Sequence, residues 1–245
     1  MTTAHTDEAP SLQLKKTQLS VPQALGWLVA MFGMQAVGLA LAIGINVLMG
    51  ADIRDPANAN PVTLMFGVLV GNLLLIVLRT EYLAAQVERI ATPRHVWLGA
   101  GAIAAALCFN TIYEAVLIGR PIQPSNAILF DAFDASIAGT MFVILAVAIS
   151  APVLEELLFR GQLQGALERW AERRGLRNPS LTALVMASAV FGAVHFQPLA
   201  FPALFTSGLA MGWIRNRTGS LTLPILMHVV MNAIGVLTLV WSSGG

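Results

Sequence analysis

The sequence contains few charged side chains. Of its 245 residues only 11% are charged whereas 56% are hydrophobic, and the mean hydropathy is +0.73. Soluble domains carry about 25% charged residues, so this chain has too few polar groups to cover a surface that faces water. We therefore predict an integral membrane protein. Its net charge of +1 also lacks the basic excess of a nucleic-acid-binding domain, so we expect no nucleic-acid partner.

Cysteine is nearly absent as well. The single Cys108, in the apolar run GAIAAALCFN, permits neither a disulfide within the chain nor a metal cluster of several thiolates. We expect it to be a small, buried apolar residue. A cleaved signal peptide is not expected, because the first apolar run is long and no small-residue cleavage site follows it.

Long apolar runs take the place of the missing charges. A helix needs about 20 apolar residues to cross about 30 Å of hydrocarbon. Seven runs approach this length, at 22–49, 61–79, 95–118, 136–159, 180–196, 199–214 and 222–241. The sequence therefore predicts an all-α fold, a polytopic bundle of about seven transmembrane helices. Residues 1–20 are expected to be a polar cytoplasmic tail, and residues 21–241 a single transmembrane domain.

The cations indicate how such a bundle is oriented. With seven spans and a cytoplasmic N-terminus, the outer segments hold only Arg54 and Arg120. The inner segments hold eleven cations, namely Lys15, Lys16, Arg79, Arg89, Arg94, Arg169, Arg173, Arg174, Arg177, Arg215 and Arg217. This bias fits the positive-inside rule. Short loops and the lack of targeting signals favour a bacterial plasma membrane. The sequence does not indicate an oligomeric state.

Six polar side chains interrupt three of the apolar runs, and they are Glu155, Glu156, Arg160, His195, His228 and Asn232. The first three lie in APVLEELLFRG, directly after the uncharged run GTMFVILAVAIS, and the others lie in FGAVH and HVVMN. An ionisable group at the bilayer centre costs about 2.5–3.5 kcal/mol, so such groups usually face the bundle interior. The six residues are therefore a candidate functional site.

Their spacing indicates which side chains share a helix face. Glu156 and Arg160 are four residues apart, as are Phe191 with His195 and His228 with Asn232. Glu155 projects about 100° away from its neighbour. We therefore expect Glu156 to pair with Arg160 and Glu155 to contact water. Each pair alone has a common structural explanation, as an interfacial ion pair or a link between helices, whereas all three together favour a site.

Three functions remain open at this point. The helical zinc signature H-E-x-x-H is absent, yet Glu155, His195 and His228 can supply three zinc ligands, with water as the fourth. Without a metal, Glu155 takes a proton from a water that His195 holds, and the water attacks a peptide carbonyl. His228 and Asn232 then donate hydrogen bonds to the developing oxyanion. A non-catalytic scaffold or transporter is the third possibility.

The motifs E-E-x-x-x-R, F-x-x-x-H and H-x-x-x-N, with the linking text GLAMGWIRNRTGSLTLPILMH, resemble a known family. It is the CPBP family of intramembrane proteases, which includes the CAAX prenyl endopeptidase Rce1 and the bacterial abortive-infection (Abi) proteins. The resemblance covers about residues 139–235. The first three predicted spans carry no motif that matches.

The resemblance implies a glutamate-type endopeptidase whose active site lies inside the bundle, toward the cytoplasmic side. It makes Glu155 the water-activating residue, Glu156 and Arg160 its partner pair, and His195 the water-orienting residue. It makes His228 and Asn232 the oxyanion donors. The implied substrates are prenylated CAAX tails in eukaryotes and peptides or membrane-protein tails in bacteria. Some relatives were classed as metalloproteases, so zinc stays an alternative.

The predicted spans conflict over the depth of the site. If the fourth span ends near residue 159 at the inner face, Glu155 lies near that face. His195, fifteen residues into the fifth span, then lies roughly 22 Å deeper. Either Pro152 breaks the fourth helix or the fifth helix begins well outside the membrane, and we favour the second explanation. Asn46 and Asn72 are expected to tie neighbouring helices together.

Overall fold

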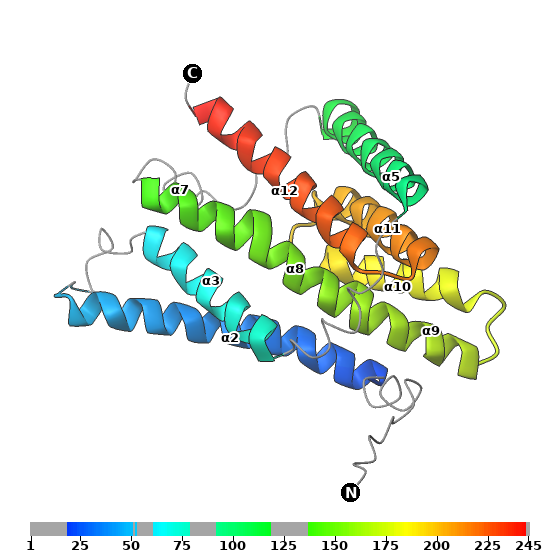
Figure 1. The fold of residues 1–245 in the computed structure, drawn as a ribbon, viewed down its shortest axis with the longest axis horizontal. Coiled ribbons are helices and arrows are strands. Elements are labelled where there is room, and N and C mark those ends of the chain that lie inside the picture. The colour runs from blue at the N-terminus through cyan, green and yellow to red at the C-terminus, as the bar shows by residue number, and fades with distance from the viewer. Residues whose placement is uncertain (1–18, 51, 53–60, 79–91, 119–136, 244–245) are drawn as a thin grey trace, which may run out of the picture.

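The computed structural model describes residues 19–50, 52, 61–78, 92–118 and 137–243. Every regular element in these ranges is a helix, which confirms the predicted all-α class (Figure 1). The first are α2 (Val21–Leu48), α3 (Pro61–Leu78), α5 (Pro93–Ile112) and its π-helical extension η2 (Tyr113–Ile118). One continuous rod follows, composed of α7 (Ile137–Val143), η3 (Ile144–Ser150), α8 (Ala151–Glu156), η4 (Leu157–Leu163) and α9 (Gln164–Arg173). The last are α10 (Pro179–Ala193), α11 (Phe201–Thr218) and α12 (Thr222–Ser243). The expected tail, residues 1–20, falls almost entirely outside the described residues.

The helix that contains the fourth apolar run is much longer than the run. It continues beyond residue 159 to Arg173 as a rod of 37 residues, with the cations of GALERWAERR at its C-terminal end. Residues 156–167 are all buried, and burial against neighbouring helices supports a helix without lipid. Pro152 does not break the rod. The wider π-helical turns of η3 precede it, at the carbonyls that a proline ring otherwise meets.

This extra length removes the depth conflict. Beyond Glu155 the rod continues for about 27 Å to Arg173, and α10 with its following turn returns about 24 Å from Pro179 to His195. Helices α9 and α10 pack against each other as an antiparallel pair. The outward and return lengths nearly cancel, so Glu155 and His195 come to the same level.

Length and composition identify the membrane-crossing candidates. Three described helices are long and apolar enough to span a bilayer, at Val21–Leu48, Pro93–Val116 and Ile137–Arg173. Three shorter apolar helices are Val62–Leu78, Pro179–Ala193 and Thr222–Thr238. Helix α11, which corresponds to the expected span 199–214, belongs to neither group. It extends to Thr218 and includes Arg215 and Arg217, which lower its hydropathy.

The outward surfaces of these helices are apolar. Val29, Val77 and Trp97 are each at least two-thirds exposed, as expected of side chains that face lipid. Cys108 is also exposed, so the expectation that it is buried was wrong. The physical reason is that lipid is as apolar as the protein interior, so an apolar side chain in a membrane gains little by facing inward.

The helices are arranged around the long rod (Figure 1). Helices α2 and α3 lie side by side along one flank of it, and α12 lies along α8 and η3 on another. Helices α10 and α11 pack on each other, α10 also packs on α9, and α5 packs on α11. The rod therefore contacts both the amino-terminal pair of helices and the carboxy-terminal helices.

Glycines bring α2 and α3 into backbone contact. A Cβ atom added to Gly38 of α2 would collide with the carbonyl of Gly67, and one added to Gly71 would lie 2.6 Å from the Cα atom of Gln35. Gly67 and Gly71 are four residues apart, the small-xxx-small spacing that lets membrane helices approach closely. The closeness of α2 and α3 thus depends on the absence of side chains.

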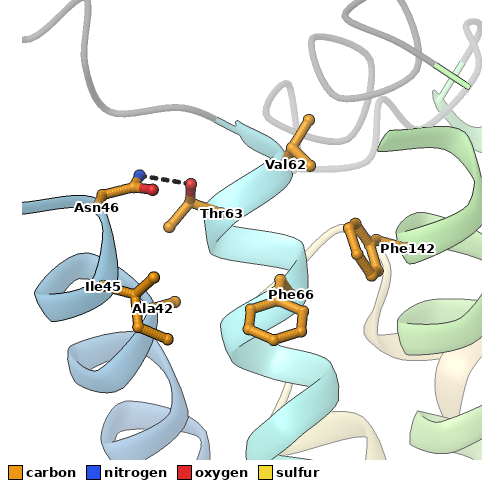
Figure 2. A pocket seen from close by; sticks show the side chains of 7 residues that line it. All are labelled: Ala42, Ile45, Asn46, Val62, Thr63, Phe66 and Phe142. Atoms are coloured by element: carbon orange, nitrogen blue, oxygen red, sulfur yellow. Dashed lines mark hydrogen bonds between the residues drawn. The ribbon is translucent and has the colours of Figure 1, made fainter. Parts of the chain in front are cut away.

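A small cleft of about 250 Å³ lies where the C-terminal part of α2 meets the N-terminal part of α3, beside α7 (Figure 2). It is lined by Ala42, Ile45, Asn46, Val62, Thr63, Phe66 and Phe142. The Nδ2 atom of Asn46 donates a hydrogen bond of 2.6 Å to Oγ1 of Thr63, which ties α2 to α3 as expected. None of these seven lining residues titrates, so we do not take this cleft as the site.

Candidate active site

A buried ion cluster joins the rod to α12. Oε1 of Glu156 accepts hydrogen bonds of 2.8 Å from Nη1 of Arg160 and from Nδ1 of His228. Glu156 is 0% and Arg160 1% exposed. Because a carboxylate beside a guanidinium acts as an acceptor, the hydrogen of this bond belongs to Nδ1 of His228. The expected pairing of Glu156 with Arg160 is therefore present, and His228 shares the same oxygen.

Other helices hold this cluster in place. The second guanidinium nitrogen of Arg160, Nη2, donates to the backbone oxygen of Gly208 in α11 at 3.2 Å. The guanidinium also lies over the ring of Phe191, 4.5 Å from its centroid, at a cation–π distance. The rod, α10 and α11 thus all contact the buried guanidinium of Arg160. These contacts fix the position of Glu156, with which it pairs.

Glu155 has a different environment from Glu156. Its side chain is 18% exposed, whereas that of Glu156 is fully buried. Its Oε2 atom lies 3.8 Å from Nε2 of His228, which is too long for a direct hydrogen bond. The two neighbouring carboxylates therefore differ as their 100° separation predicts, one fixed in an ion cluster and one available to a ligand or water.

The available carboxylate opens on a cavity of about 350 Å³. The cavity is lined by Met31, Phe32, Gln35, Glu155, Phe159, Val194, His195, Phe196 and Gln197. These residues come from α2, from the rod, and from the end of α10 with the turn that follows it. A cavity of this size is in the range that binds small ligands or a short peptide segment.

His195 lies in the turn after α10, with its ring fixed by a backbone contact. Its Nδ1 atom is 2.7 Å from the carbonyl oxygen of Phe191. A carbonyl only accepts, so Nδ1 carries the hydrogen, and the Nε2 atom of the neutral ring offers a lone pair. The next residue, Phe196, has φ of 53°, a left-handed conformation that costs a non-glycine residue about 1–2 kcal/mol.

Phe191 is the packing centre of the site. Its ring makes edge-to-face contacts with His195 at 4.9 Å, with His228 at 5.8 Å, and with Phe159 at 5.1 Å between centroids. It is 1% exposed. Because one rigid ring touches both imidazoles, the positions of the two histidines are coupled through it.

Asn232 lies apart from the cavity-lining residues. Its Nδ2 atom donates a hydrogen bond of 2.9 Å to the backbone oxygen of Val147 in η3, about two turns before Glu155 along the rod. The structure therefore places Glu155 and His195 on one cavity. Glu156, Arg160 and His228 form the buried cluster next to Glu155, and Asn232 lies one turn of α12 beyond His228. The role of Asn232 as an oxyanion donor stays a prediction.

Sequence reasoning missed Gln35. It lies in α2, in a span with no recognised motif, and it lines the same cavity as Glu155 and His195. Its Nε2 atom donates a hydrogen bond of 2.9 Å to Oδ1 of Asn72, an amide that was expected to tie helices together and does so. A polar side chain in the middle of the apolar run 22–49 was the signal that could have found it.

The described residues do not gather in the geometry of a metal site. Among them, no group of three or more His, Cys, Asp or Glu side chains is arranged to hold a metal ion. His228 uses Nδ1 to bind Glu156, and His195 uses Nδ1 to bind a carbonyl. Contacts of this kind also orient zinc-binding histidines, which then bind the metal through Nε2. The departure from a zinc site therefore lies in the placement of Glu155, His195 and His228, which are not gathered as three ligands of one ion.

The family comparison matches the part of the chain that carries these groups. Residues 137–234 match the family model described as type II CAAX prenyl endopeptidase Rce1-like. We call these residues the Rce1-like domain. The expected extent, 139–235, agrees closely with it. This Rce1-like domain runs from α7 into α12 and contains all six predicted site residues, whereas α2, α3 and α5 lie outside it.

Two curated proteins are similar to the chain. One is the "Uncharacterized 24.3 kDa protein" of Escherichia coli, 32% identical over 160 residues, which cover 62% of this chain and 66% of that protein. The other is the "Putative membrane peptidase YdiL" of Bacillus subtilis, 31% identical over 126 residues, which cover 51% of this chain and 46% of that protein. The chain thus spans just under two thirds and about half of these relatives. No solved structure matched the chain.

Proposed function

We propose that this protein is an intramembrane endopeptidase of the glutamate type. It hydrolyses peptide bonds in membrane-associated proteins or their C-terminal tails, as the description of its Rce1-like domain suggests. The observation that carries the proposal is the shared cavity. Glu155 and His195, which are far apart in sequence, both line it, and Glu155 lies beside His228. The protein acts in a bacterial plasma membrane, as its short loops predict. Its N-terminus lies in the cytoplasm, as its cation distribution predicts.

The first step uses Glu155 and His195. Glu155 takes a proton from a water molecule, while Nε2 of His195 accepts the other hydrogen of that water and so orients it. The water oxygen attacks the peptide carbonyl carbon, and the carbonyl oxygen becomes an oxyanion. Glu155 then passes its proton to the amide nitrogen as the carbon–nitrogen bond breaks, which yields a carboxylic acid and an amine. The backbone contact of His195 supports this role because it leaves Nε2 as the acceptor.

The oxyanion formed by the attack of water needs hydrogen-bond donors, and His228 is the first of them. With Nδ1 bound to Glu156, a protonated His228 presents Nε2–H on the side of Glu155. Removing such a donor typically costs about 10²–10³ in kcat. Asn232, one turn of α12 from His228, is the second donor, through the N–H that does not bond to Val147.

The test is cleavage by the full-length protein in detergent micelles. Quenched fluorescent CAAX peptides, prenylated and unmodified, and an unrelated membrane-inserted peptide form the substrate panel. Glu155→Gln keeps the size of the side chain but removes the base, so cleavage is expected to fall by about 10³-fold with unchanged melting. The matched control is Glu168→Gln on the same rod, because Glu168 is paired with Arg215 away from the cavity.

Each outcome separates the candidate functions. Cleavage that Glu155→Gln abolishes and a metal chelator leaves intact supports the glutamate mechanism. Cleavage that the chelator abolishes instead indicates the zinc-dependent alternative. No cleavage of any peptide by the wild-type protein, or full cleavage by Glu155→Gln, overturns the proposal and favours the scaffold or transporter.

A further inference from the structure

We infer that Gln35 of α2 is a substrate-binding residue whose side-chain amide pairs with the main chain of the peptide in the cavity. This inference rests on the proposed peptidase function. It adds a residue from outside the Rce1-like domain to the site, since the domain begins at residue 137 and Gln35 lies about a hundred positions earlier.

Gln35 is on the wall of the cavity that holds the reacting groups. Met31 and Phe32, one turn before it on α2, line the same wall, and Glu155 and His195 line the cavity from the rod and from the turn after α10. A peptide that reaches Glu155 and His195 therefore lies against α2. Among the three lining residues of α2, Gln35 alone has hydrogen-bonding groups on its side chain.

A chain of hydrogen bonds fixes which way the amide of Gln35 points. Oγ of Ser150 lies 2.9 Å from the backbone oxygen of Ala146, which can only accept, so the hydroxyl hydrogen goes there. Oγ of Ser150 must then accept from Nδ2 of Asn72, at 3.1 Å. This turns Oδ1 of Asn72 toward Gln35, whose Nε2 donates to it at 2.9 Å.

The same chain leaves two groups of Gln35 for a ligand. A primary amide has two N–H donors and one carbonyl acceptor. One N–H is used by Asn72, and the second N–H and Oε1 make no hydrogen bond with the described residues. Asn72 is 0% and Ser150 4% exposed, so the anchoring partners are buried and rigid. One donor and one acceptor side by side match the C=O and N–H groups of an extended peptide.

Backbone contact between α2 and α3 places Gln35 beside its anchor. Gly71 lies directly against Gln35, so that a Cβ at position 71 would come within 2.6 Å of the Cα atom of Gln35. Asn72, the next residue of α3, then reaches the amide of Gln35. The backbone contact at Gly71, the buried amide of Asn72 and the hydroxyl of Ser150 thus act together to hold the Gln35 side chain at the cavity.

Recognition through main-chain groups has a clear consequence for specificity. Such contacts hold a peptide in an extended conformation without selecting its side chains. Gln35 would therefore align the scissile bond with Glu155 for many sequences, and its loss should weaken binding rather than the chemical step. This distinguishes Gln35 from the glutamate, whose loss affects the chemical step.

The experiment measures binding and turnover for the CAAX peptide of the panel that the wild-type protein cleaves. Gln35→Leu is expected to raise KM about tenfold and to leave kcat within about twofold, as the loss of one or two hydrogen bonds predicts. The same peptide is expected to bind about tenfold more weakly to Gln35→Leu in the Glu155→Gln background, measured by fluorescence anisotropy, where nothing is cleaved.

The matched control is Asn46→Leu. Asn46 is also an amide of α2 that binds α3, but it lies about 16 Å farther along the helix, at the cleft of Figure 2. The Asn46→Leu variant should lower the melting temperature, as Gln35→Leu does, but it should leave KM unchanged. An equal rise in KM for both variants would show that the effect acts through helix packing, and would overturn the inference.

The substrate supplies a second test, in which the peptide is altered and binding is measured first to the wild-type protein and then to Gln35→Leu. N-methylation or ester replacement of single backbone positions removes one N–H at a time. One position should weaken binding to wild-type protein about tenfold and have no effect in Gln35→Leu. The inference is overturned if no position weakens binding to the wild-type protein, or if KM and affinity stay at wild-type values in Gln35→Leu while Glu155→Gln is inactive. Full cleavage by Glu155→Gln instead overturns the proposed function itself.

Discussion

The Rce1-like domain and the α2–α3 pair both hold helices together inside a membrane, but through different groups. The domain buries charge, with Glu156, Arg160 and His228 joined inside the bundle. Helices α2 and α3 contain no charged residue at all. They are held together by glycine backbones in contact and by amides that bond to neighbouring helices.

The difference teaches how polarity is distributed in an apolar solvent. A buried charge is tolerated where oppositely charged or hydrogen-bonding partners offset it, and it is retained where chemistry needs it. Neutral amides and glycines cost less and suffice where only position matters. Substitutions in the buried ion cluster of the domain should therefore lower stability and activity together, whereas those in the α2–α3 pair should shift position and affinity.

The largest effect is expected from Arg160→Met in the ion cluster. It leaves Glu156 buried with one partner fewer, which should destabilise the protein by about 3–5 kcal/mol. The double variant Glu156→Gln/Arg160→Met removes both charges and should recover part of this loss without recovering activity. Unfolding by a denaturing detergent measures the difference. A single variant as stable as the wild type would show that the pair does not hold the domain together.

A smaller loss is expected from Gly38→Leu at the contact between α2 and α3. The new side chain meets the backbone of Gly67, and overpacking of this kind costs about 1–3 kcal/mol. Gly44→Leu is the matched control, since it lies on the same helix and a Cβ there has no neighbour within 4 Å. Equal melting temperatures for the two variants would contradict the close approach of α2 and α3.

Ser150→Ala tests the link between the two regions. It leaves the Nδ2 atom of buried Asn72 without its acceptor, which should cost about 1 kcal/mol or somewhat more. It should also raise KM, because Asn72 orients Gln35. Ser188→Ala is the control, since Ser188 is equally buried and also bonds the carbonyl four residues earlier. The prediction fails if both serine variants change KM alike.

The smallest effect is expected from Phe196→Gly. Glycine adopts the left-handed conformation freely, which should stabilise the fold by about 1 kcal/mol after the entropy that glycine loses on folding. Phe196 also lines the cavity, so the same change should raise KM. A more stable protein with weaker substrate binding would indicate that strain is kept for function. A less stable variant would contradict this account of the strain.

Local patterns predicted most of the fold. Each apolar run became a helix whose start lay within a few residues of the prediction, since hydrophobic length and proline positions act locally. The apolar run of the fourth helix stops at residue 159, while burial of Leu163 and Ala166 by neighbouring helices continues the rod to Arg173. Packing between helices that are distant in sequence produces no repeating pattern along the chain from which it could be predicted.

The candidate site was predictable to the same degree. The four-residue spacing of Glu156 and Arg160 indicated their pairing, which needs only helix geometry. Gln35 was missed because its importance comes from Gly71 and Asn72 on another helix. The direction of Asn232, toward the carbonyl of Val147, likewise depends on how α12 crosses the rod.

The sequence by itself determined that this chain is helical, that it belongs in a membrane, and which polar residues share a helix face. Charge content, run length and spacing are properties of neighbouring residues, so they can be read along the chain. Only the tertiary structure decided that Glu155 and His195 come level across the α9–α10 pair, and that α2 closes their cavity with Gln35. Those meetings depend on how far each helix runs and on which backbones can touch, and both are set by packing across the whole bundle.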